Sequence, residues 1–204
     1  MRDSASLRLV AIVDTLGNGL DDLVARARIA VDSGATAVQL RLRGEDARTL
    51  LSACRVLVGA LSVPVIVHDR ADVAVAGGAA GVHLSPDEMS TPVVRGVVPA
   101  GMLLGASVGG TPDLERARAA DYVSIGPVFA PGVRVSDGTA IGIDEFGRLA
   151  RMAEVSVIAV GGIAPDNARS VLEAGAVGVA VITGAFAETQ AAHAIRELRA
   201  AIET

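Results

Sequence analysis

Short apolar runs alternate along this chain with longer stretches in which charged residues recur at helical spacing, as in 20–34 and 165–176. The apolar runs are 8–13, 36–41, 64–68, 80–84, 102–107, 121–126, 156–161 and 177–182. Runs of this length predict buried β-strands, and the stretches between them predict amphipathic helices. Strands that alternate with helices pair in parallel through helical crossovers.

Eight such strand–helix units predict an α/β fold, a single (β/α)8 TIM barrel that occupies residues 1–204 as one domain. A weak internal repeat favours this architecture, because a small-residue turn leads into a strand at 32–41, 76–85 and 173–183, and more loosely at 118–126. These copies fall on every second strand, as in a barrel built from two-strand quarters. An open doubly wound sheet is the alternative, but no G-x-G-x-x-G follows the first strand.

Composition narrows the class of protein. Half of the residues are hydrophobic, only 2% are aromatic, and the net charge is −5, which disfavours nucleic acid as the main partner. The apolar stretches are too short and too interrupted to span a membrane, and the first one is too short for a signal-peptide core. The one cysteine, Cys54, lies in a predicted helix and is expected in the core. We therefore expect a cytoplasmic protein. The sequence leaves open whether it forms a homo-oligomer.

Polar residues follow the second strand, where Gln39, Arg41 and Arg43 alternate with apolar neighbours. In a strand, alternate residues share a face, so these three point together to the barrel mouth or to solvent. Active sites of such barrels lie at the C-terminal ends of the strands. Because arginine suits phosphate, the pattern favours an anion site; a solvated strand end is the alternative.

Acidic residues follow strands three and four, namely Asp69 and the pair Asp87 and Glu88. Carboxylates placed in this way can hold Mg²⁺, which in turn holds a diphosphate. Capping of the following helices is the alternative function for each of them. Two histidines on the same strands, His68 and His83, are candidates either for acid–base chemistry or for structural hydrogen bonding.

The last three strand ends are rich in glycine and proline. Residues 126–142 form the longest irregular segment, which we interpret as a lid or binding loop carrying Arg134, with a plain surface loop as the alternative. Gly161-Gly162 follow strand seven and Thr183-Gly184 follow strand eight. Glycines at these positions let backbone N–H groups approach an anion, so the pattern predicts a phosphate site there.

Seven strand-end motifs occur in order along nearly the whole chain. They are QLRLR (39–43), HDR (68–70), GVHLSPDE (81–88), GAS (105–107), DYVSIGPVF (121–129), GGI (161–163) and GVAVIT (178–183). Together they resemble the thiamine-phosphate synthase/TenI family, whose corresponding motifs include Q-L-R-x-K, N-D-R, G-V-H-L-G-Q-E-D and D-Y-x-x-x-G-P-x-F. The resemblance implies a barrel that binds phosphorylated small molecules.

The synthase of that family joins a pyrimidine methyl diphosphate to a thiazole phosphate and releases diphosphate. The resemblance implies that Asp69 and Glu88 hold Mg²⁺, and that Arg43, His68 and Arg134 are the catalytic candidates. It assigns the pyrimidine diphosphate to Gln39, Arg41, Arg43, His68, Ser107 and Arg134. The thiazole phosphate is expected at the backbone of Gly162, Ile182 and Thr183, next to Gly161.

The chain departs from the family pattern at several of these positions. The motif lysine is Arg43, the motif asparagine is His68, a metal-binding aspartate is Glu88, and the Thr-x-Thr-Lys lid is Pro-Gly-Val-Arg at 131–134. These departures predict weak synthase activity. Two alternatives stay open: a TenI-like thiazole tautomerase, although Pro127 stands where its histidine is expected, and a non-catalytic phosphate-binding or regulatory descendant.

Overall fold

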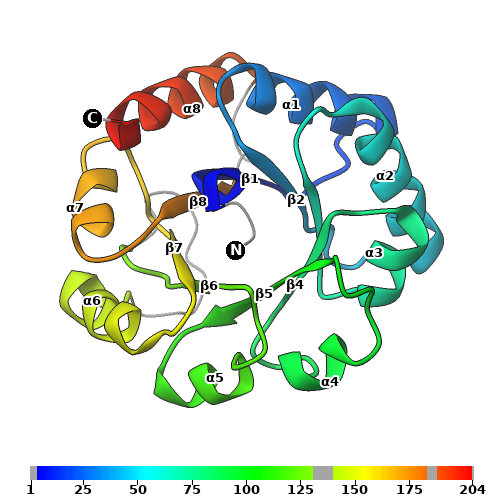
Figure 1. The fold of residues 1–204 in the computed structure, drawn as a ribbon. Helices are drawn as coiled ribbons and strands as arrows, with labels where there is room; N and C mark the ends of the chain where they lie inside the picture. The colour runs from blue at the N-terminus through cyan, green and yellow to red at the C-terminus, as the bar shows by residue number, and fades with distance from the viewer. Residues whose placement is uncertain (1–3, 131–139, 183–187, 204) are drawn as a thin grey trace.

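Eight parallel strands form a closed barrel in the order β1 to β8, and β8 pairs back to β1 (Figure 1). The computed structural model describes residues 4–130, 140–182 and 188–203. The strands are β1 (Leu9–Val13), β2 (Ala37–Leu40), β3 (Val65–His68), β4 (Gly81–Leu84), β5 (Leu103–Val108), β6 (Tyr122–Ile125), β7 (Ser156–Val160) and β8 (Gly178–Ile182). Each agrees with its predicted run to within one residue at either end, so the predicted barrel is confirmed and the open-sheet alternative is wrong.

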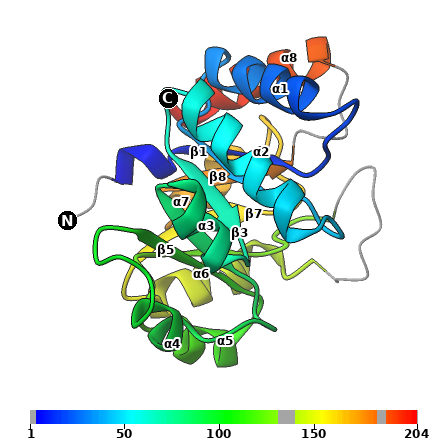
Figure 2. The ribbon, with the colours of Figure 1, turned by 90° about the vertical axis from the view of Figure 1, so that its right-hand side faces the viewer.

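Helices follow the strands and form an outer ring around the barrel (Figures 1 and 2). They are α1 (Leu20–Asp32), α2 (Ala47–Ala60), α3 (Ala71–Gly77), α4 (Thr91–Arg95), α5 (Thr111–Arg116), α6 (Gly142–Met152), α7 (Ala168–Glu173) and α8 (Glu188–Glu203). Cys54 on α2 is fully buried between helix and barrel, as expected. Among the described residues, none of these helices is both long and apolar enough to cross a bilayer.

The core has an inner and an outer part, because successive residues of a strand face opposite sides. One set of buried side chains packs between strands and helices in two large clusters. The other set fills the barrel interior and includes Val10, Ile66, Tyr122 and Ile158. A short 3-10 helix, η1 (Ser4–Leu7), covers the N-terminal end of the barrel, where Leu7 joins the interior cluster (Figure 2). The floor of the barrel is thus closed and apolar.

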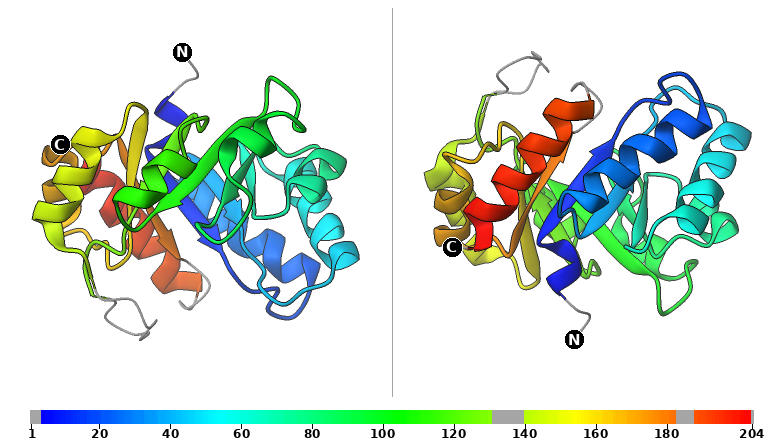
Figure 3. Two further views of the ribbon diagram at one scale, coloured as in Figure 1. Left: turned by 90° about the horizontal axis from the view of Figure 1, so that it is seen from below. Right: turned by 90° about the horizontal axis from the view of Figure 1, so that it is seen from above.

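The interior becomes polar toward the C-terminal ends of the strands. On β2 the inward positions change from Ala37 to Gln39, and on β3 from Ile66 to His68. On β6 they change from Tyr122 to Ser124. Ligand sites of this fold lie at the same end. The two views in Figure 3 show the strands that carry these positions inside the helical ring.

Candidate active site

A hydrogen-bonded cluster joins the ends of β2, β3 and β4. Gln39 Nε2 lies 3.0 Å from His68 Nδ1, and the other ring nitrogen of His68 lies 3.1 Å from Ser85 Oγ and 3.1 Å from Asp69 Oδ2. Ser85 also donates from its hydroxyl to Asp69 Oδ2 at 2.9 Å and from its backbone N–H to Asp69 Oδ1 at 2.7 Å. The structure therefore brings three predicted site residues together and adds Ser85.

Asp69 has a constrained backbone and an ionised side chain. Its φ of 61° lies in the left-handed region, and the N–H of Arg70 donates to the carbonyl of His68 across it at 2.8 Å. Such conformations cost about 1–3 kcal/mol and concentrate at functional sites. Although burial opposes ionisation, the hydrogen bonds from His68 and Ser85 lower the pKa of Asp69 to about 2. The capping alternative is wrong for Asp69, because Arg70 is the N-cap of α3 and no side chain caps that helix.

Arg41 supplies a positive charge near this cluster. Its side chain is half-buried, and its Nε atom is buried without a hydrogen-bond partner within the described residues. Burial and the neighbouring charge of Arg43 lower the pKa of Arg41, while Asp14 and Asp69 oppose that shift. A buried guanidinium N–H that no protein group among the described residues accepts suits an incoming anion. Arg43 itself is exposed at the rim.

A second polar network lies one strand further round, beneath the mouth. His83 on β4 is 2% exposed, and its Nδ1 lies 2.9 Å from the Tyr122 hydroxyl. Its Nε2 lies 2.9 Å from Ser107 Oγ and 3.1 Å from Ser124 Oγ. Burial lowers the pKa of His83 to about 3, so this ring is neutral near pH 7. This arrangement fits the alternative of structural hydrogen bonding for His83. Ser107 connects the network to the site.

The loop after β4 carries the two other acidic candidates, Asp87 and Glu88, whose side chains are both exposed. Neither caps α4, whose N-cap is Ser90, so that alternative is also wrong. The N–H of Glu88 donates to the carbonyl of Ser85 at 3.2 Å, which ties this loop to the residue that holds Asp69. Within the described residues no three acidic, histidine or cysteine side chains form a metal-binding group.

The opposite side of the mouth is built from backbone. Gly161 and Gly162 follow β7 with φ of 89° and 65°, and within the described residues their N–H groups donate to no other protein group. A Cβ on Gly162 would lie 2.6 Å from the carbonyl oxygen of Phe129. Asn167 fixes this turn by donating to the carbonyl of Gly162 at 2.9 Å. Ile182 ends β8 and is 38% exposed.

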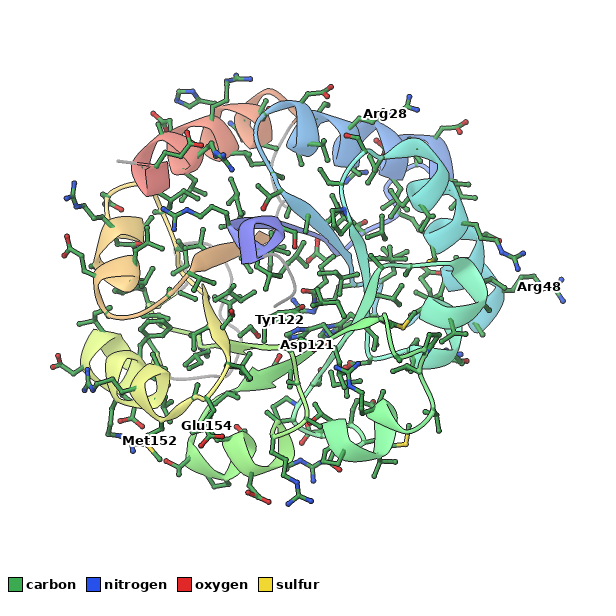
Figure 4. The ribbon with its side chains drawn as sticks, in the orientation of Figure 1. Arg28, Arg48, Asp121, Tyr122, Met152 and Glu154 are labelled. Atoms are coloured by element: carbon green, nitrogen blue, oxygen red, sulfur yellow. The ribbon has the colours of Figure 1, made fainter. Side chains whose placement is uncertain are left out.

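Two predicted site residues, Arg134 and Thr183, lie outside the described residues. Sequence reasoning missed Asp14, Ser85, Tyr122 and Ser124. The last two had a usable signal, because Tyr122 and Ser124 alternate with apolar residues in the sixth strand and so share its inner face. Figure 4 shows Tyr122 near the centre of the barrel, whereas Arg28, Arg48 and Met152 lie on its outside.

Comparison with known proteins agrees with the motifs. A family model described as thiamine monophosphate synthase matches residues 9–185. A thiamine-phosphate synthase of Methanoculleus marisnigri is 39% identical over 91% of this chain and 90% of its own length. Another, of Azorhizobium caulinodans, is 37% identical over 86% and 85%. The solved structure of a thiamine phosphate pyrophosphorylase from Pyrococcus furiosus is 32% identical, with a TM-score of 0.81 over 98% of this chain and 96% of that one. The predicted resemblance is confirmed: the chain belongs to the thiamine monophosphate synthase family.

Proposed function

We propose that this protein is a thiamine-phosphate synthase, which couples a pyrimidine methyl diphosphate with a thiazole phosphate. In this reaction the bond between the methylene carbon and the diphosphate oxygen breaks, and the diphosphate departs with its electron pair. The thiazole nitrogen then forms the new bond to that carbon. The barrel has to hold one diphosphate and one monophosphate at the same mouth, with the reacting carbon and nitrogen between them.

The observation that carries this proposal is the half-buried Arg41, whose Nε has no partner among the described residues and whose charge interacts with that of the ionised Asp69. A guanidinium in this position stabilises the charge that develops on a departing diphosphate. Gln39, held by His68, and Ser107, held by His83, extend the same wall with groups suited to the pyrimidine. The N–H groups of Gly161 and Gly162, which donate to no other group among the described residues, suit the monophosphate on the other side.

The residues present fit a magnesium ion. Asp69 is ionised and offers hard oxygen ligands, and Glu88 lies on the loop that is hydrogen-bonded to Ser85. We infer that Asp69 and Glu88 hold Mg²⁺ when diphosphate is present, since two carboxylates alone bind this ion weakly. The bound ion would neutralise charge on the diphosphate. Without it, Asp69 keeps its carboxylate oriented through Ser85 and His68.

The departures from the family pattern are expected to change the rate of this reaction and not its type. His68 stands where the family has asparagine, yet it bridges Gln39 and Ser85 through both ring nitrogens. We propose that this bridge preserves the wall while the changed lid at 131–134 lowers turnover. The tautomerase alternative is less favoured, because Pro127 stands where its histidine is expected and both ring nitrogens of His68 and of His83 are already hydrogen-bonded.

Steady-state formation of thiamine phosphate tests the proposal. We expect turnover from both substrates that requires Mg²⁺ and stops on chelation. Arg41→Gln should lower kcat/KM by about 10²-fold, because removing one group that stabilises developing charge has effects of this order. The exposed Arg118, which pairs with Glu115 on the outside, provides the matched control Arg118→Gln. Ligand-induced stabilisation without any turnover would instead support the non-catalytic binding protein.

A further inference from the structure

Four residues form a relay that runs from the barrel interior to the mouth: Tyr122, His83, Ser124 and Ser107. His83 contacts all three hydroxyl groups, at 2.9 Å for Tyr122, 2.9 Å for Ser107 and 3.1 Å for Ser124. Tyr122, His83 and Ser124 are buried, whereas Ser107 is partly exposed. Ser107 is therefore the member of the relay that a ligand in the mouth can reach.

The inner end of the relay fixes where the protons lie. The Tyr122 hydroxyl is fully buried, and its hydrogen-bond partner within the described residues is His83 Nδ1. A buried O–H that lacks an acceptor is costly, so the phenol donates to Nδ1. An Nδ1 that accepts carries no proton. The ring therefore carries its single proton on Nε2.

The outer end then has a fixed direction as well. The Nε2–H of His83 donates toward Ser107 Oγ, and Ser124 Oγ lies 3.4 Å from Ser107 Oγ as a second donor. Ser107 Oγ thus accepts from Nε2 and, over a longer contact, from Ser124, and its own hydroxyl hydrogen is left for the mouth. We propose that Tyr122, His83 and Ser124 are positioning residues that fix Ser107 as a hydrogen-bond donor to an acceptor atom of the bound substrate. This inference rests on the proposed function for the identity of that substrate, a pyrimidine methyl diphosphate.

The two rings of the relay meet in the space next to Gly105. A Cβ on Gly105 would lie 2.2 Å from the Cζ atom of Tyr122 and 2.5 Å from His83 Nδ1. The glycine of the G-A-S motif on β5 is thus what allows the phenol and the imidazole to meet. On its other side the His83 ring stacks against His68, with centroids 6.0 Å apart and planes inclined by 15°.

The tautomer of His83 tests the relay without reference to activity. The full chain labelled with ¹⁵N-histidine contains three histidines, and His83→Gln identifies the signal of interest by its loss. We expect a ring protonated at Nε2 and unprotonated at Nδ1, unchanged from mildly acidic to mildly basic pH. A ring protonated at Nδ1, or charged near neutral pH, would overturn the relay.

A pair of variants tests what the relay does for binding. Tyr122→Phe removes the donor to Nδ1, and Ser107→Ala removes the final hydroxyl. We expect each to weaken binding of pyrimidine methyl diphosphate by about tenfold, or about 1.4 kcal/mol. The double variant should bind no more weakly than Ser107→Ala alone, because Tyr122 acts through Ser107.

Calorimetric titration of the four proteins measures this coupling, and Ser62→Ala, on an exposed loop, should bind as the wild type does. Losses that simply multiply in the double variant, or wild-type affinity in Tyr122→Phe, would contradict the inference. A wild-type chain that binds no pyrimidine diphosphate would overturn the proposed function, and the tautomer measurement would still decide the relay.

Discussion

The two sides of the barrel mouth present different chemical groups to a ligand. On the side of β2 to β6, polar side chains line the wall, and several of them are held by another side chain, as Asp69 is by Ser85 and Ser107 is by His83. On the side of β7 and β8, glycines bring bare backbone to the surface, and Gly162 has no space for even a Cβ. We call these the side-chain wall and the backbone wall.

This difference shows how each wall tolerates sequence change. A side chain can be replaced by another with matching hydrogen bonds, as His68 bridges Gln39 and Ser85 in place of the family's asparagine. A glycine at a positive φ has no such substitute, since other residues are strained there. The departures at Arg43, His68 and Glu88 accordingly fall on the side-chain wall, while the G-G-I motif at 161–163 is intact.

The largest effect is expected from restoring the lid, whose positions lie outside the described residues. Pro131 and Val133 replace two hydroxyl-bearing residues of the motif. A hydrogen bond to a charged ligand contributes about 1.5–3 kcal/mol, so two of them change turnover by roughly two to four powers of ten. The triple variant Pro131→Thr, Val133→Thr and Arg134→Lys should therefore raise kcat above that of the wild type. Equal rates in a thiamine phosphate assay would show that the lid departures are harmless.

Removing the central charge of the side-chain wall should have the next largest effect. Asp69→Asn deletes the ionised carboxylate while keeping its shape, and we expect kcat/KM to fall by on the order of 10²–10³-fold. The matched control is Asp72→Asn, whose carboxylate is 67% exposed and pairs with Arg70 on the outside. Steady-state kinetics at saturating Mg²⁺ compare the two. Equal activities would remove Asp69 from the proposed site.

The backbone wall is tested by the smallest possible addition. Gly162→Ala places a Cβ 2.6 Å from the Phe129 carbonyl oxygen at a φ of 65°. Strain of about 1–3 kcal/mol should weaken thiazole phosphate binding by roughly tenfold to a hundredfold. Gly59→Ala on α2 meets no atom within 4 Å and should stabilise the fold by about 0.5–1 kcal/mol. Unchanged affinity in Gly162→Ala would refute the assignment of phosphate to this turn.

Acid should lower the free energy of unfolding of the protein through His83, which lies beneath the side-chain wall. Its pKa is lowered by burial from 6.5 to about 3, so between these values the unfolded chain binds a proton there that the folded protein does not. The free energy of unfolding attributable to this group therefore falls with falling pH, by about 1.4 kcal/mol per unit below pH 6.5. Denaturant titrations should show a shallower pH dependence for His83→Gln. The exposed His193→Gln should follow the wild type, and a wild-type slope in His83→Gln would contradict this origin.

The sequence predicts the fold and the strand ends well, because alternation and glycine turns are local signals. All eight strands and the family were predictable, and so was the polar face of Gln39 and Arg41. The contact between His83 and Tyr122 was not, since it joins residues 39 positions apart through the space left by Gly105. Asp69 also escaped prediction in detail, because its positive φ turns its carboxylate toward Ser85 instead of the following helix.

Crossed calorimetric titrations measure whether the two walls bind different substrates. Wild type, Arg41→Gln and Gly162→Ala are each titrated with pyrimidine methyl diphosphate in Mg²⁺ and, separately, with thiazole phosphate. We predict that Arg41→Gln loses affinity for the diphosphate alone, and that Gly162→Ala loses affinity for the thiazole phosphate alone. Equal losses for both ligands in either variant, or the reverse pattern, would contradict the assignment of the diphosphate to the side-chain wall and of the monophosphate to the backbone wall.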